Sequence, residues 1–169
     1  KENENEWVLP TPSAFDSSEI VAVREWVRDG GSLFLIADHM PFPAAAEELA
    51  AEFGVFMCNG FAMIDGGDDG RISYSQRAGS LSDHPITRGR NKDERVDSIV
   101  AFTGQAFRLR SKGDALMTLG RNIVLLMPQV GWQCSKRTPG LLASGMLQGA
   151  VLGFGRGRVA GFGEAAMFS

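Results

Sequence analysis

The sequence predicts a single α/β domain built on a mostly parallel sheet, with hairpins added toward its C-terminal end. A helical pattern from Ser17 to Asp29 is followed by a Gly-Gly turn and then by the apolar run Leu33 to Ala37. An uninterrupted apolar run suits a strand that is covered on both faces, as in a parallel sheet. Further along, two strand-like segments flank Gly155-Arg156-Gly157, and glycine on both sides of a short loop indicates an antiparallel hairpin.

The first helix has a start signal and an apolar stripe. Asp16, followed three residues later by Glu19, predicts a capping box. Ile20, Val23 and Val27 recur at helical spacing, which places one apolar face against a core. Gly30 and Gly31 then supply the backbone freedom with which helices commonly end.

The next elements are expected to follow one another closely. Residues 44–53 predict a second helix, with Pro43 in its first turn. Val55 to Cys58 predicts a short strand, and the Gly-, Asp- and Ser-rich residues 60–82 predict an ordered loop or a short hairpin. The remaining expectations are a strand at 95–102, a hairpin of 115–119 with 123–127, a hairpin of 148–154 with 158–162, and the start of a helix after 163.

Composition narrows the class of protein. The 169 residues carry a net charge of −3 and are 44% hydrophobic and 22% charged, as in an ordinary globular domain. This charge favours neither a nucleic-acid nor an anionic-membrane partner, and no apolar run reaches the length of a membrane span. Since the chain begins at Lys1 and stops where a helix is expected to start, we predict that native segments are missing at both ends. Cys58 and Cys134 permit either one disulfide or two free thiols.

Ionisable side chains follow two predicted strands. Asp38 and His39 come directly after the 33–37 strand, and Glu164 comes after the 158–162 strand. Ligand sites in open α/β sheets form beyond the carboxyl ends of strands. We therefore expect these three side chains to act as catalytic base, orienting group and acid, or alternatively to hold a divalent metal as cofactor. The structural alternative is that Asp38 caps the following turn, that His39 is a satisfied histidine, and that Glu164 only favours a helix start.

A second histidine site lies on a loop stiffened by Pro85. We expect His84 to reach toward the Asp38 cleft and bind substrate, together with Arg88, whose planar guanidinium suits carboxylates and phosphates. The alternative is a loop histidine bonded to backbone and a surface arginine. In the first case the expected partner is a small-molecule substrate or ligand.

Three other sequence patterns resemble functional motifs but are better explained as structural features. Cys58 lacks the small-residue elbow expected around an exposed nucleophile, and its apolar neighbours favour burial. The acidic residues 65–70 resemble a calcium loop but lack its alternating ligands and closing glutamate, so a solvated turn is expected. Residues 153–157 are not a dinucleotide loop, because a strand rather than a helix follows them.

Several longer strings resemble a known family. They are Trp26 to His39, Pro41-Phe42, Phe53-Gly54-Val55, Asp83 to Arg90, Phe102-Thr103-Gly104-Gln105 and Gly157 to Met167. Together they resemble an uncharacterised bacterial branch of the class I glutamine-amidotransferase-like superfamily, related to trehalose-utilisation-type and gliding-motility-type domains. The resemblance implies a flavodoxin-like three-layer sandwich and mildly favours export from the cytoplasm.

The resemblance also bears on activity. The position that would hold the nucleophilic cysteine of a true amidotransferase holds Asp38-His39 here, which implies that glutamine amidotransfer is lost. Two functions remain open. One is a hydrolase-like enzyme that uses Asp38, His39 and Glu164. The other is a non-catalytic ligand- or protein-binding module, which predicts that Asp38 and Glu164 are satisfied by backbone donors.

Overall fold

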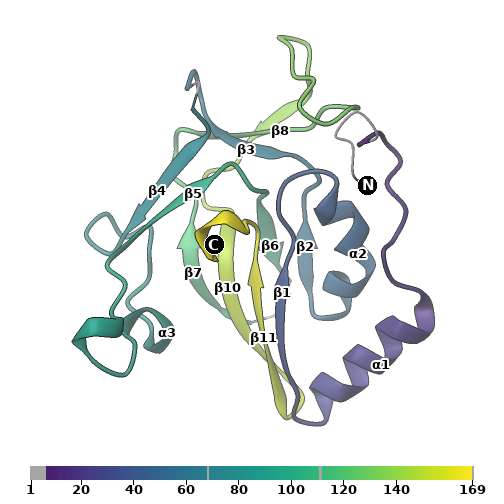
Figure 1. Ribbon diagram of the computed structural model, residues 1–169, viewed down its shortest axis with the longest axis vertical. Coiled ribbons are helices and arrows are strands. Elements are labelled where there is room, and N and C mark those ends of the chain that lie inside the picture. The colour runs from purple at the N-terminus through teal and green to yellow at the C-terminus, as the bar shows by residue number, and fades with distance from the viewer. Residues whose placement is uncertain (1–6, 68, 111, 169) are drawn as a thin grey trace.

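The computed structural model describes residues 7–67, 69–110 and 112–168, which form three β-sheets and two principal helices (Figure 1). The main sheet has the strand order β1-β11-β10-β6-β2, with β7 pairing to β10 beside β6. Its strands are β1 (Ser32–Ile36), β2 (Val55–Met57), β6 (Phe107–Leu109), β7 (Asp114–Thr118), β10 (Leu147–Phe154) and β11 (Gly157–Phe162).

Two smaller sheets form a further layer. One has the order β3-β8-β9 and the other pairs β4 with β5, and every pairing in both is antiparallel. Their strands are β3 (Phe61–Ile64), β4 (Arg71–Ser75), β5 (Ser98–Phe102), β8 (Ile123–Leu126) and β9 (Gly140–Leu142).

The two longer helices cover one face of the main sheet, whereas a single helical turn borders its other face. They are α1 (Ser17–Arg28), α2 (Phe42–Glu52) and the single turn α3 (Pro85–Arg88), with short 3₁₀ turns at Lys92–Glu94 and Ala166–Phe168. The capping box predicted for α1 is confirmed, since the Asp16 carboxylate accepts from Ser18 and Glu19 while the Glu19 carboxylate accepts from the Asp16 N–H. The buried face of α1 presents Ile20 and Val27, as predicted.

Two hydrophobic clusters lie on opposite faces of the main sheet. The first joins α1 and α2 to alternate side chains of the sheet, among them Leu35, Leu152 and Val159. The second lies between the main sheet and the two smaller sheets and contains Phe162 and Leu125. Because neighbouring residues of a strand point to opposite faces, β10 and β11 contribute to both clusters.

The predicted fold class is wrong. The sheet is not mostly parallel, because β1 with β11 is the one parallel pairing among the described strands. The molecule is also not a flavodoxin-like three-layer sandwich, because small antiparallel sheets lie where that fold has helices. An apolar run shows that a strand is covered on both faces but not what covers it, and this ambiguity produced the error.

The positions of several individual strands were predicted correctly, although their arrangement was not. The strands expected at 33–37, 55–58 and 95–102 are present with shifted ends, and the 148–154 with 158–162 hairpin is confirmed as β10 with β11. The hairpin expected from 115–119 with 123–127 is wrong, because β7 pairs with β10 whereas β8 pairs with β3 and β9. Residues 60–82 are not a loop or local hairpin, since β3 and β4 pair with the distant strands β8 and β5.

Within the described residues, no helix has both the length and the apolar character needed to cross a bilayer.

Candidate functional site

Asp38 and Glu164 lie side by side at the carboxyl edge of the main sheet. The parallel pairing of β1 with β11 carries both strands to the same edge, and each carboxylate follows its strand. The Asp38 carboxylate accepts from the N–H of His39 at 2.7 Å and from the N–H of Ala165 at 3.3 Å. The juxtaposition of these two side chains, expected from the sequence, is therefore present.

Glu164 is completely buried and bonded to backbone. Its two oxygens accept from the N–H groups of Ala166 at 2.7 Å and Met167 at 2.9 Å, which closes the turn Ala166–Phe168. Burial raises the pKa of Glu164, the N–H groups of Met167 and Ala166 oppose that rise, and the charge of Asp38 adds to it. The carboxylate is thus held by its own loop rather than aimed at open space.

His39 is not directed toward these carboxylates. Its Nδ1 lies 2.8 Å from the carbonyl oxygen of Met40, and because a carbonyl can only accept, Nδ1 is the donor in this hydrogen bond. The imidazole is stacked on Phe61 with 4.8 Å between ring centroids and meets Trp132 edge-on at 4.7 Å. Trp7 and Phe42 complete this aromatic cluster. The geometry does not bring Asp38, His39 and Glu164 together as a triad.

Sequence reasoning missed a set of buried polar side chains, two of which lie on the segment beside Glu164. Among the described residues, no hydrogen-bond partner is found for Oγ1 of Thr103, Nε2 of Gln105 or either side-chain amide atom of Asn59. The Gln105 N–H donates to the Gly163 carbonyl at 2.7 Å, so this segment lies against the Glu164 loop. Buried polar atoms are normally bonded, and unsatisfied ones mark places where a ligand group or water can be held.

Thr103 is also unusual in its backbone. Its φ of 54° lies in the left-handed region, where a β-branched residue is strained. The side-chain amide of Gln148 holds this segment by donating to the carbonyls of Thr103 at 2.7 Å and Gln105 at 3.1 Å, while the Tyr74 hydroxyl donates to Gln148. The one sequence signal for this feature was the Phe102–Gln105 string, which carried no chemistry of its own.

The second predicted site is separate from the first. His84 lies on the open face of the main sheet, where its Nδ1 accepts from the Ile86 N–H at 3.2 Å and its Nε2 faces the Asp114 carboxylate at 3.8 Å. Arg88 binds Asp83 through both oxygens, at 2.8 and 3.0 Å, and does not line the groove that His84 lines. Arg88 is thus paired with Asp83 at the surface.

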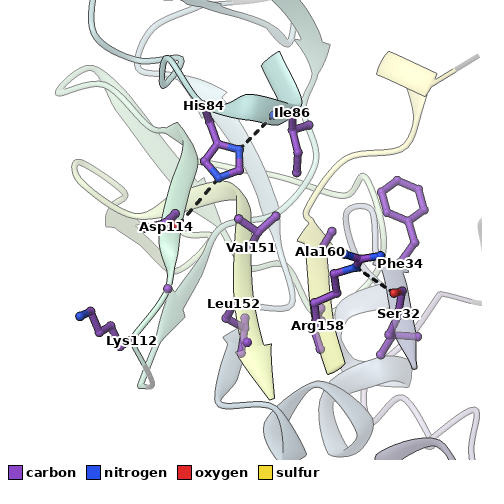
Figure 2. Close-up of a pocket in the computed structure, with 14 residues that line it drawn as sticks. Ser32, Phe34, His84, Ile86, Lys112, Asp114, Val151, Leu152, Arg158 and Ala160 are labelled. Carbon is purple, nitrogen blue, oxygen red and sulfur yellow. Dashed lines mark hydrogen bonds and ion pairs between the residues drawn. The ribbon is translucent and has the colours of Figure 1, made fainter. Parts of the chain in front are cut away.

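The groove beside His84 has a volume of about 640 Å³, within the usual range for ligand sites (Figure 2). Its floor is the sheet face that bears Phe34, Val151 and Ala160, and α3 borders it with Ile86. Polar side chains stand around this floor; they are Ser32, His84, Lys112, Asp114 and Arg158. Arg158 donates from Nε to the Ser32 hydroxyl at 2.9 Å. The groove is therefore an apolar surface with a mixed polar rim.

The weaker sequence patterns behave as structural features. Burial raises the pKa of the half-buried Cys58 thiol, which is the opposite of activation. Cys58 and Cys134 are both free. Asp69 accepts from the Arg71 N–H at 3.1 Å within a turn, whereas residue 68 of the acidic segment lies outside the described residues. No group of three His, Cys, Asp or Glu side chains suited to a metal ion occurs in the part of the chain that the structure describes.

Comparison with known proteins changes the family assignment. No protein-family model matches the chain, and no curated protein matches it. A solved structure described as the mmIFT52 N-terminal domain is similar, with a TM-score of 0.61 and 14% sequence identity, over 92% of this chain and 63% of that one. At this identity the likeness concerns the fold alone. Together with the mostly antiparallel sheets, it overturns the assignment to the glutamine-amidotransferase-like superfamily.

Proposed function

We propose that this chain is a non-catalytic binding module whose ligand site is the groove over Phe34, Val151 and Ala160. The observation that carries the proposal is the state of the predicted catalytic groups. Asp38 and Glu164 accept from backbone N–H groups, and the His39 ring is turned into an aromatic cluster. Acid–base chemistry needs such groups within reach of one reacting atom.

The groove supplies what a binding site needs. Apolar side chains cover its floor, and Phe34 and Ile86 remain 54% and 52% exposed. Single exposed apolar residues are common, but a concave apolar surface with polar groups at its rim is typical of a ligand site. The His84 ring accepts a hydrogen bond from the Ile86 N–H and faces Asp114 at 3.8 Å, which favours a shaping role over proton transfer.

The test is to map small-molecule fragments by amide chemical shifts. Expected are shifts confined to residues around Val151 and Ala160, abolished by Val151→Arg and kept in Asp38→Asn. Shifts that centre on Asp38 and Glu164 instead would overturn the proposal.

The hydrolase-like enzyme is a second candidate because of the unpartnered polar atoms of Thr103 and Gln105, whose segment lies against the Glu164 loop. It predicts hydrolysis of chromogenic esters, amides or phosphates that falls at least about 100-fold in Asp38→Asn, the usual scale for loss of an acid–base group. Equal rates for the wild type and the variant, or for the wild type and a blank without protein, would exclude it.

A further inference from the structure

The geometry points to an amphipathic α-helix with an acidic flank, contributed by a partner protein, as the occupant of the groove. This inference rests on the proposed function and adds the kind of ligand. Two observations carry it: the uneven covering of the main sheet, and the charges around the groove.

The main sheet is covered differently on its two faces. Helices α1 and α2 bury one face in the first hydrophobic cluster. On the other face the small sheets cover the end that bears Phe162, whereas the groove exposes the part that bears Phe34 and Val151. A sheet face that is apolar is stably buried by a packed layer, and a helix is the usual one in folds with helices on the opposite face.

The apolar surface is also wider than the groove itself. Phe34, which is 54% exposed, packs edge-on against Phe168, which is 50% exposed, with 5.2 Å between ring centroids. Ile86 borders the groove from α3 (Figure 2). A helix about 10 Å across contacts such a surface through side chains at i, i+3, i+4 and i+7. This extent favours a polypeptide over a compact small molecule.

The charged side chains around the groove favour a helix with acidic residues on its flank. Arg158 and Lys112 both line the groove, and neither forms an ion pair with any described residue. The acidic side chain in the lining, Asp114, faces His84. Figure 2 shows Arg158 and Lys112 on either side of Leu152, at the end of the groove near Ser32, so they stand apart along one edge of the floor. Carboxylates along one edge of a helix would meet these cations at the rim.

The whole molecule has the opposite charge, which makes the test discriminating. The net charge of −3 attracts basic peptides in a non-specific way, whereas the groove selects acidic ones. The probes are two synthetic 18-residue helical peptides with leucine at i, i+3, i+4 and i+7, one with glutamate and one with lysine on the flanks. Their binding is measured by fluorescence anisotropy at about 0.15 M salt, where the screening length is about 8 Å.

We expect the acidic peptide to bind at least about 10-fold more tightly than the basic one. Phe34→Asp should abolish this binding, and Arg158→Glu combined with Lys112→Glu should reverse the preference. The matched control is Phe56→Asp, since Phe56 is also an exposed phenylalanine in an edge strand of the same sheet but lies outside the groove. Unfolding midpoints of the variants confirm that each is folded.

The inference is overturned if the basic peptide binds equally well, if neither peptide binds, or if Phe56→Asp is as damaging as Phe34→Asp. It is also overturned if the protein dimerises and Phe34→Asp makes it monomeric, because a second copy is then the occupant. If the peptides fail but fragments still shift the groove amides, the binding function stands without the helix. If both fail, both proposals are wrong.

Discussion

Close packing beside Glu164 depends on a single glycine. Gly104 has a φ of +77°, and a Cβ added there would lie 2.4 Å from the Gly163 carbonyl oxygen, 2.7 Å from the Gln148 amide nitrogen and 2.8 Å from the Glu164 Cβ. Two of these neighbours are backbone or rigidly held, so they have little room to move. Gly104 thus allows the Thr103–Gln105 segment to lie against the Glu164 loop.

Gly104→Ala should therefore lower the free energy of unfolding by much more than the backbone strain at this positive φ alone would. Gly79→Ala is the matched control, because Gly79 has a φ of +73° but nothing within 4 Å of an added Cβ. In the control, backbone strain should lower the free energy of unfolding by about 1 kcal/mol. In Gly104→Ala, overpacking should lower it by about 1–3 kcal/mol more. Urea denaturation measures both, and equal losses would show that the contact at Gly104 relaxes freely.

Glu164 makes the free energy of unfolding fall as pH rises, the reverse of the usual effect of a carboxylate. Its pKa is raised from the ordinary 4.5, chiefly by burial, so the folded chain binds this proton more tightly than the unfolded chain. The contribution of Glu164 to stability is then largest below pH 4.5 and falls as pH rises through its raised pKa. Asp16, Asp83 and Glu94 have lowered pKa values and act in the opposite sense below that window.

Glu164→Gln removes this titration and leaves the other carboxylates in place. The free energy of unfolding of wild type, relative to the variant, should therefore decline as pH rises above the ordinary value of 4.5 and through the raised pKa. Urea unfolding of both proteins across this range gives the difference directly. Parallel curves would mean that the backbone N–H groups cancel the effect of burial.

At the scale of single elements, α1 offers a direct measure of its buried face. Val27 is fully buried against the first cluster, whereas Val21 is 56% exposed on the same helix. Val27→Ala should lower the free energy of unfolding by about 2 kcal/mol, at roughly 0.8 kcal/mol per buried methylene plus a cavity term. Val21→Ala should change it by less than about 0.5 kcal/mol. Similar losses in thermal or urea denaturation would contradict the packing described for α1.

Elements whose signals are local were predicted, and elements defined by distant partners were not. The start of α1 is determined within four residues by Asp16 and Glu19, and the β10–β11 hairpin by the Gly155 turn, so both are readable from sequence. In contrast, β3 and β4 pair with β8 and β5, and nothing in residues 60–82 specifies those partners. The parallel sheet was wrongly predicted for the same reason.

The candidate site shows the same division. That Asp38 and Glu164 meet followed from their positions after two strands, which proved to be parallel neighbours. The orientation of His39 depends on Phe61 and Trp132, which come from other segments, and was not predictable. The groove was not predicted, because it forms where no layer covers the sheet face, and no local sequence signal marks such a gap. His84, one residue of its rim, was nevertheless singled out.

At the scale of the whole molecule, the two hydrophobic clusters share strands. Leu152 and Val159 belong to the first cluster, while Val151 and Ala160 pack against the second from the same two strands. Unfolding of either cluster therefore uncovers one face of β10 and β11, and the other cluster packs on the opposite face of these same strands. This sharing predicts one cooperative unfolding unit rather than two.

Matched truncations in the two clusters test that cooperativity. Leu49 of α2 is 3% exposed in the first cluster, and Leu125 of β8 is fully buried in the second. Each Leu→Ala change should cost about 2–5 kcal/mol and should lower the hydrogen-exchange protection of both α2 and β8 by the same free energy. If Leu125→Ala weakens β8 and β3 but leaves α2 protected, the small sheets unfold separately, and the layer beside the groove is an independent unit.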